Sequence, residues 1–331
     1  MADSSDRVPH QPNPDEINLT AENGEDAWLD RGFTLIVWTC AWATVAVLFV
    51  MSWVIFKDAQ PAIQAFGVKF LWDQTWNVGQ LVFGAAPYIY GTIVSSAIAL
   101  LLAVPIGIAV ALVTSEDMLP EWVRSLLAFI IELIAAIPSV IVGLWGIFVL
   151  VPFLLPIQYW LYNHFKWIPL LSTEPFGPGM LAAGVLLGIM ILPTIAAISR
   201  EVLLAVPQEL RSASMSLGAT RWETIFRVSL PTAATGILGA AMLALGRALG
   251  ETMAVTMVIG NSAQISPSLL DLGYTIPAVL VNKFPEASEK LEIGALMYLA
   301  LILFALTLIV NIIAVLMVQL IGRRGTATTI F

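Results

Sequence analysis

The chain has 331 residues, of which 59% are hydrophobic and only 11% are charged, and its mean hydropathy is +0.88. This composition excludes a soluble globule, because too few polar side chains are present to cover its surface, and it predicts an all-α protein of the lipid bilayer. The sequence has one cysteine and two histidines. An internal disulfide framework, a cysteine metal cluster and a Ser-His-Asp triad within the membrane are thereby excluded, so we expect no metal-ligating and no catalytic residues.

Residues 1–32 form a polar, acidic segment. It holds eight Asp and Glu residues against Arg7 and Arg31, so it carries −6 of the formal net charge of −8. Such a segment has too little apolar surface to offset the loss of chain entropy on folding, and we predict a disordered cytoplasmic tail. The first apolar run begins at Phe33 and has membrane-spanning length, so we expect a retained first helix and no cleaved signal.

Six apolar stretches long enough to cross a bilayer follow the tail. They cover residues 33–56, 89–114, 125–151, 180–199, 235–260 and 293–321. We therefore predict a six-helix transmembrane domain over residues 33–322 and a short cytoplasmic tail over 323–331. Basic residues near the span ends number nine on the side of the N-terminus and five on the other side. This bias predicts a multi-pass protein of the plasma membrane with both termini in the cytoplasm.

The loop between the fourth and fifth spans, residues 200–235, is the one sizeable loop expected on the cytoplasmic side. Pro207 is typical of a helix start and Gly218 of a helix end, so a helix of about eleven residues is predicted between them. A second turn over Arg221–Arg227 is favoured by Glu223 and Arg227 at i,i+4, and Leu230 and Pro231 are expected to turn the chain back to the membrane. The first helix has a small, weakly apolar face suited to a groove in a partner protein.

The spacing in this loop is similar to the EAA motif of ABC importer permeases, which reads Glu-Ala-Ala, three residues, Gly, nine residues, a branched apolar residue, any residue and Leu-Pro. The matching residues here are Ser212, Ala213, Ser214, Gly218, Val228, Leu230 and Pro231, with serines in place of the acid and of the second alanine. No G-x-x-x-x-G-K-[ST] loop occurs in the sequence, so ATP and Mg²⁺ are expected on a separate ATPase. An interfacial helix hairpin without a partner is the alternative.

Two ionisable residues, Arg247 and Glu251, lie one helical turn apart on one face of the predicted fifth span. Intramembrane charges cost roughly 3 kcal/mol each on insertion scales and persist where they are paired or border water. One interpretation is a self-neutralised pair that fixes helix packing beside Gly246 and Gly250. The other is a solute path, in which the guanidinium fork binds a tetrahedral oxyanion and Glu251 holds it between passages. Glu132, in the predicted third span, is interpreted as structural or as a further lining residue of the path.

A resemblance to a known family covers nearly all of residues 33–322. It is carried by FGAAPYIYGT at 83–92, IPSVIVGLWG at 137–146, LGATRW at 217–222 and GRALGET at 246–252. On these motifs the chain resembles the PstC family, the permease subunits of bacterial phosphate-specific ABC importers.

The resemblance implies a MetI-like fold with six transmembrane helices, and alternating access driven through the loop around Gly218. It implies four kinds of partner: a PstA-like second permease, a PstB-like ATPase dimer, a PstS-like external phosphate-binding protein and the lipid bilayer. It also implies that Arg247 and Glu251 occupy positions associated with phosphate passage, and that this chain is itself no enzyme. We expect no bound cofactor and no nucleic-acid partner. A permease for molybdate or sulfate, and a standalone channel or secondary carrier, remain as alternatives.

Overall fold

The computed structural model describes residues 24–116 and 118–327. The contacts divide the chain into two compact units, whose boundary falls between Val54 and Ile55 within the first helix, α1 (Gly24–Phe66). The helix α1 begins at Gly24, within the segment predicted as a tail. The rest of the predicted tail, residues 1–23, lies outside the described residues.

The second unit is almost entirely helical. After α1 it contains η1 (Gly67–Leu71), β1 (Trp76–Asn77), β2 (Val82–Phe83), α2 (Ala86–Ser115), α3 (Glu121–Ala135), α4 (Ser139–Trp145), η2 (Gly146–Leu150), α5 (Val151–Phe165), η3 (Pro169–Leu171), α6 (Met180–Leu204), α7 (Gln208–Ser216), α8 (Arg221–Thr224), η4 (Ile225–Ser229), α9 (Leu230–Gly250), α10 (Met253–Val258), α11 (Ile276–Lys283) and α12 (Lys290–Ala327). The two strands pair antiparallel, with Trp76 opposite Phe83. The last helix runs to Ala327, past the predicted end of the membrane domain at residue 322.

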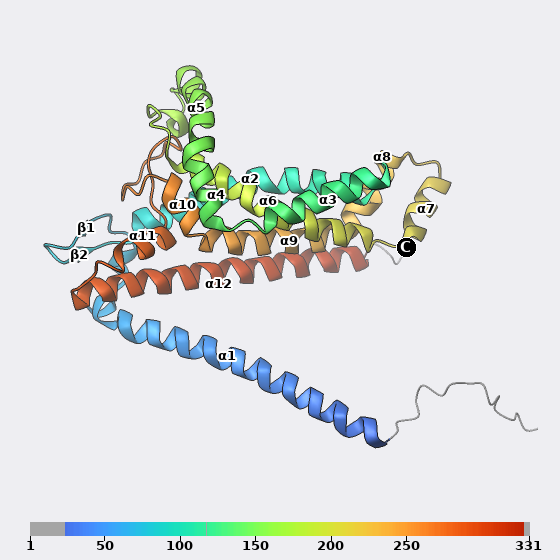
Figure 1. The fold of residues 1–331 in the computed structure, drawn as a ribbon, viewed down its shortest axis with the longest axis horizontal. Coiled ribbons are helices and arrows are strands. Elements are labelled where there is room, and N and C mark those ends of the chain that lie inside the picture. Colours follow the sequence, from blue (N-terminus) through green and yellow to red (C-terminus); the bar gives the residue numbers. More distant parts are fainter. Residues whose placement is uncertain (1–23, 117, 328–331) are drawn as a thin grey trace, which may run out of the picture. The chain divides into compact units, whose positions relative to one another are not determined.

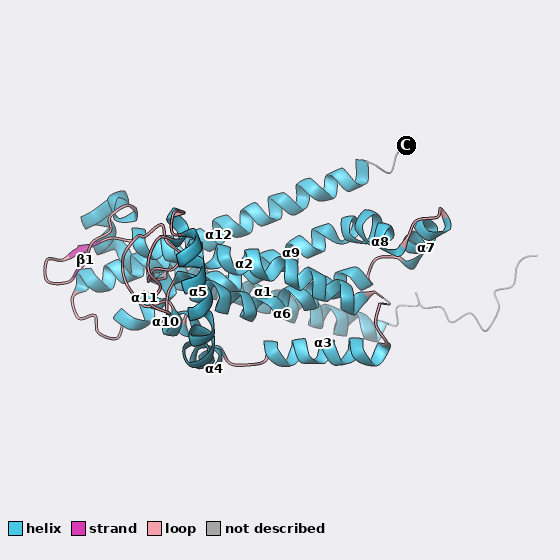
Figure 2. Cartoon of the chain, turned by 90° about the horizontal axis from the view of Figure 1, so that it is seen from above, coloured by secondary structure: helices cyan, strands magenta, loops and turns pink. Residues whose placement is uncertain are grey.

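The helices α2, α6, α9 and α12 run side by side along the second unit, and α6 packs against both α2 and α9 (Figures 1 and 2). Glycine allows α2 and α6 to approach closely. A Cβ atom at Gly184 would lie 2.5 Å from the side chain of Ile98, and one at Gly107 would lie 2.8 Å from that of Ile195. Small residues at helix contacts are the usual means of tight packing in a bilayer, where apolar burial between helices gives no driving force.

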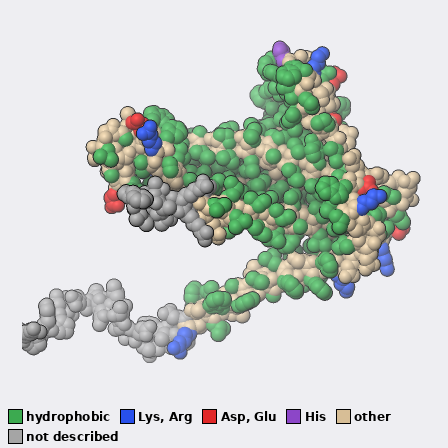
Figure 3. All heavy atoms as spheres, turned by 180° about the vertical axis from the view of Figure 1, so that it is seen from behind, with side chains coloured by type: hydrophobic (Ala, Val, Ile, Leu, Met, Phe, Trp, Pro, Cys, Tyr) green, Lys and Arg blue, Asp and Glu red, His purple; other side chains and the backbone are tan. Residues whose placement is uncertain are grey.

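Three buried clusters hold this unit together. The largest lies on α6 and its neighbours and includes Leu186, Leu187 and Ile191. The second includes the aromatic side chains of Phe83, in β2, and Tyr88. The third is smaller and joins α2, α6 and α9. Hydrophobic side chains also cover most of the face seen in Figure 3, and charged side chains gather towards its ends. This is the surface expected of helices that contact lipid along their length.

Among the residues that the structure describes, six helices are long and apolar enough to cross a membrane. They cover residues 31–71, 86–115, 139–165, 180–204, 221–250 and 290–320. The predicted number of spans is confirmed, and five of them overlap their predicted stretches closely.

The third predicted span, residues 125–151, is wrong as a single helix. The chain breaks between α3 and α4, after Ala135, because Pro138 disfavours a helical Ile137 before it. The 15 residues of α3 rise about 22 Å, less than the roughly 30 Å of a hydrocarbon core. Beyond the break, α5 runs across the direction of α2, α6 and α9 (Figures 1 and 2).

Candidate functional site

The loop between the fourth and fifth spans forms a helical hairpin, residues 207–229, which we call the α7–α8 hairpin. Its first helix, α7, has nine residues rather than the eleven predicted, and it begins directly after Pro207 as expected. Gly218 follows with φ +88°, a left-handed conformation that glycine adopts without strain. A Cβ atom there would meet nothing within 4 Å, so conformation and not crowding requires glycine at the turn.

The second half of the hairpin begins with a capping box that the sequence analysis missed. The backbone N–H of Thr220 donates to Glu223 Oε2 at 2.8 Å, and the N–H of Glu223 donates to Thr220 Oγ1 at 3.3 Å. Glu223 therefore caps α8, whereas the prediction paired it with Arg227. The pattern Thr-x-x-Glu at residues 220–223 was available as the signal for this cap.

The prediction that Leu230 and Pro231 turn the chain back is also wrong. Helix runs without interruption from Arg221 to Gly250, through α8, the π-helical η4 and α9. Pro231 lies in the first turn of α9, directly after the π-helical segment. Because proline has no N–H to donate, a widened turn before it lets the helix continue.

Two polar contacts tie the hairpin to the ends of α2 and α6. Arg211 Nη1 lies 3.1 Å from Oε1 of Glu116, the residue that follows α2, with the two side chains only 17% and 16% exposed. Arg211 Nη2 donates to the carbonyl oxygen of Leu203 in α6 at 2.6 Å. Within the hairpin, the hydroxyls of Ser214 and Thr224 lie 3.0 Å apart. The base of α7 is thus fixed to both neighbouring helices.

The hairpin exposes several large apolar side chains among polar ones. The motif residues Ser212 and Ala213 are exposed, whereas Ser214 turns inward. Leu210 is exposed and Leu217 is 90% exposed, which agrees with the predicted face of α7. Trp222 and Phe226, which the sequence analysis did not single out, stack with ring centroids 6.1 Å apart and are both exposed. Their i,i+4 spacing was the available signal for this extension of the surface.

The structure separates the charged pair predicted in the fifth span. Helix α9 ends at Gly250, and Glu251 is extended with ψ 127°, so it does not share a helix face with Arg247. Arg247 Nη1 donates instead to Thr194 Oγ1 of α6 at 3.5 Å. Among the described contacts, no ion pair joins Arg247 to Glu251.

The stretch predicted as the fifth span, residues 235–260, is therefore discontinuous, because α9 ends at Gly250 and α10 begins at Met253. Between α9 and α10 the chain is unwound, and the hydroxyl of Thr252 donates to the carbonyl oxygen of Gly250 at 3.1 Å. Arg247 lies in the last turn of α9, where a positive charge is favoured by the helix dipole. Unwound backbone within a span is tolerated where it is buried in protein or lines a water-filled path, and it is characteristic of solute sites in transporters.

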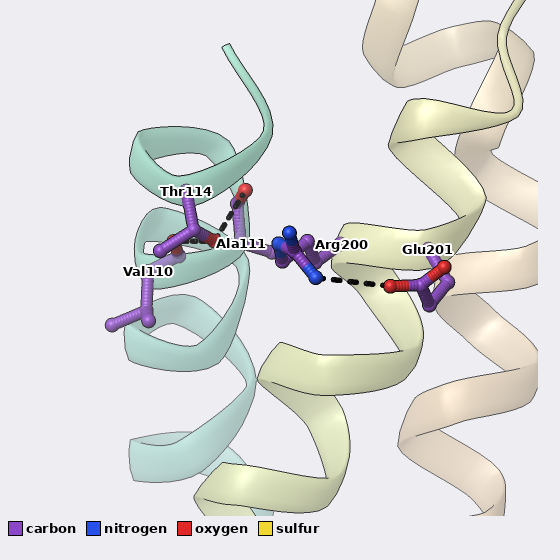
Figure 4. Close-up of polar contacts among 5 residues, drawn as sticks. All are labelled: Val110, Ala111, Thr114, Arg200 and Glu201. Carbon is purple, nitrogen blue, oxygen red and sulfur yellow. Dashed lines mark hydrogen bonds and ion pairs between the residues drawn. The ribbon is translucent and has the colours of Figure 1, made fainter. Parts of the chain in front are cut away.

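Glu132 lies apart from both Arg247 and Glu251. It is exposed on α3 and lines a cavity of about 180 Å³ with Arg200 and Glu201 of α6 and Thr114 of α2. Arg200 Nη1 donates to Glu201 Oε1 at 3.0 Å, and Figure 4 shows the guanidinium between α2 and Glu201. Neither Arg247 nor Glu251 lines this cavity. The structure thus does not bring the three predicted path residues together.

Comparison with known proteins agrees with this architecture. Residues 103–325 match the family model described as binding-protein-dependent transport system inner membrane component. The chain is 42% identical over 309 residues to the phosphate transport system permease protein PstC of Xylella fastidiosa (strain 9a5c), covering 90% of this chain and 93% of that protein. It is 39% identical over 267 residues to a probable phosphate transport system permease protein PstC of Methanocaldococcus jannaschii, covering 78% and 84%.

Among solved structures, the chain is similar to one of a bacterial alginate ABC transporter in complex with an alginate pentasaccharide-bound periplasmic protein. The TM-score is 0.56 at 16% identity, with 87% of this chain and 95% of that chain covered. This likeness shows the fold alone, and the predicted permease class is confirmed by the family model and the relatives.

A bundle of apolar helices that carries a helical hairpin between its fourth and fifth spans defines the chain as a permease of the binding-protein-dependent type. Within that class, the chain belongs to the PstC family.

Proposed function

We propose that this chain is a permease subunit of an ATP-driven importer of inorganic phosphate. The names of its relatives at up to 42% identity support phosphate as the solute. The observation that carries the proposal is the discontinuous fifth span, which holds a guanidinium and a carboxylate beside unwound backbone in an otherwise apolar helix bundle.

Arg247 binds the passing phosphate in this proposal. Its side chain is exposed, and its hydrogen bond to Thr194 is at the long limit of 3.5 Å. A weakly held guanidinium exchanges this neutral partner for a phosphate oxyanion at little loss, and a path needs such transient binding. Glu251 lies on the unwound segment, where its negative charge weakens the binding of phosphate, so that the phosphate dissociates again. Glu132 faces Arg200 and Glu201 across another cavity, so we assign it no contact with phosphate.

Energy enters through the α7–α8 hairpin. Leu210, Leu217, Trp222 and Phe226 present exposed apolar surface on a hairpin that lies at one end of the bundle (Figure 1). The chain lies in a bacterial inner membrane with both termini on the cytoplasmic side, so the hairpin faces the cytoplasm. There a PstB-like ATPase dimer binds the hairpin in a groove. A PstA-like permease completes the solute path, and a PstS-like binding protein delivers phosphate from outside.

Uptake of ³²P-labelled phosphate tests the proposal, in cells that lack other phosphate carriers and express the complete importer. We expect uptake that requires ATP, that is abolished by Arg247→Gln with the complex still assembled, and that is retained in the control Arg31→Gln, at an exposed position outside the hairpin and the fifth span. Uptake at the normal rate by Arg247→Gln would show that Arg247 serves only helix packing. Preferential uptake of molybdate or sulfate would assign another oxyanion, and transport without ATP would assign a channel or secondary carrier.

A further inference from the structure

A cavity of about 340 Å³ lies where the α7–α8 hairpin meets the ends of α2 and α6, and nothing in the proposed transport cycle uses it. Its wall is formed by the end of α2 and the residues after it, α3, the end of α6, α7 and α8. Its lining residues with polar or charged side chains are Ser115, Glu116, Arg124, Gln208, Arg211, Ser212, Arg221 and Thr224.

The charge around this cavity is positive. The described lining residues include three arginines, Arg124, Arg211 and Arg221, and one carboxylate, that of Glu116. A guanidinium has five N–H donors in a planar fork, so an arginine that already makes one contact keeps donors for a ligand.

One of these donors is without an acceptor. Arg211 uses Nη1 for Glu116 and Nη2 for the carbonyl oxygen of Leu203, but its Nε is buried and has no hydrogen-bond partner among the described atoms. Because this nitrogen has almost no accessible surface, a ligand in the cavity reaches it only if the Arg211 side chain moves. The cavity itself therefore offers guanidinium groups from three helices and an excess of positive charge.

We propose that this cavity binds a phosphate-class anion, which is either free inorganic phosphate or the phosphate headgroup of an anionic phospholipid. A phosphate group carries several oxygen acceptors around one phosphorus atom, and it can therefore accept hydrogen bonds from guanidinium groups on three different segments. The site is distinct from the solute path, because Arg247 and Glu251 do not line it. It exists whichever anion the bundle transports.

An anion in this cavity would bridge α3, through Arg124, to the hairpin, through Arg211 and Arg221. The base of α7 would then be held by an anion in addition to the Glu116–Arg211 ion pair. We expect occupancy to protect the amides of residues 208–216 from hydrogen exchange, because local opening of α7 would require the bridge to break.

The test uses the complete importer in nanodiscs, either of phosphatidylcholine alone or with added phosphatidylglycerol. The double variant Arg124→Gln/Arg221→Gln removes two of the guanidinium groups that line the cavity. The matched control is Arg227→Gln, since Arg227 lies on the same hairpin but does not line the cavity. Two probes are used: equilibrium binding of ³²P-labelled inorganic phosphate, and native mass spectrometry of retained phosphatidylglycerol. Phosphate in the solute path is common to all three proteins, so the difference between them reports on the cavity.

For free phosphate, we expect a saturable site in phosphatidylcholine nanodiscs that the double variant weakens tenfold or more and the control preserves. For a lipid headgroup, we expect retained phosphatidylglycerol that the double variant loses. In either case the same ligand protects residues 208–216 in the wild type and not in the double variant. Arg221→Gln alone, at an exposed position, replaces the double variant if that does not assemble. Equal occupancy of wild type and variant by both probes would overturn the proposal.

Discussion

The ion pair between Arg211 and Glu116 is the contact whose loss we expect to loosen the α7–α8 hairpin most. The two side chains are more than four-fifths buried, and Arg211 also holds the carbonyl oxygen of Leu203. We compare Arg211→Gln, Glu116→Gln and the double variant. Arg211→Gln should destabilise more than Glu116→Gln, because it strands a buried carboxylate and also removes the hydrogen bond to Leu203.

The magnitude follows from the geometry. At 3.1 Å and an effective dielectric constant of about 20, the Coulomb attraction is about 5 kcal/mol. Desolvation of both ions and the ordering of two side chains oppose it, so a coupling free energy of about 1–3 kcal/mol is expected between them. The double variant should therefore be less destabilised than the sum of the two single variants.

Hydrogen exchange of the α7 amides in the assembled complex measures this coupling as the free energy of local opening. Arg227→Gln serves as the control, because Arg227 is exposed on the same hairpin. The reasoning would be refuted if the losses of opening free energy in the two single variants sum to within about 0.5 kcal/mol of the loss in the double variant. Such additivity is the behaviour of independent sites.

Three further outcomes are expected. Thr220→Ala removes the capping box and should lower the free energy of local opening of α8 by about 1 kcal/mol, as read from hydrogen exchange of residues 221–224. Gly184→Ala places a Cβ atom 2.5 Å from Ile98 and should destabilise the complex by about 1–3 kcal/mol in thermal unfolding, whereas Gly239→Ala, with nothing within 4 Å, should not. Ala213→Glu puts a charge on the exposed face of α7 and should abolish transport-stimulated ATP hydrolysis; full stimulated hydrolysis would count against the hairpin as the coupling element.

Hydropathy was sufficient to predict most of the fold, because a bilayer span must be apolar over a fixed length. It failed where tertiary packing decides. The run Ala-Leu-Gly-Glu-Thr-Met reads as continuous helix, since most of these residues are good helix formers. The break at Glu251 places α10 against α4, where a Cβ atom at Gly143 would lie 2.9 Å from Ala254 Cα. That close contact joins residues more than 100 positions apart in the sequence, so no local sequence pattern predicts it.

The site divides in the same way. Gly218 and the start of α7 were predictable from local chemistry, because turn and cap positions restrict residue type. The Arg211–Glu116 ion pair was not, since it joins a charge on the hairpin to one after α2 with no periodic relation between them. The separation of Arg247 from Glu251 was missed because the i,i+4 rule applies only within an unbroken helix.

Two polar contacts lie along α6 and connect the hairpin to the broken fifth span. Leu203 accepts from Arg211, and Thr194 accepts from Arg247. Leu203 and Thr194 are nine residues apart on one helix, or about 14 Å. A displacement of α7 that pulls on Leu203 therefore moves the partner of Arg247 as part of the same rigid body. Arg211→Gln, which cuts the first of these contacts, is expected to raise the ATP hydrolysed per phosphate imported. An unchanged ratio, measured in proteoliposomes with the hairpin shown to be loosened, would exclude α6 as the route of coupling.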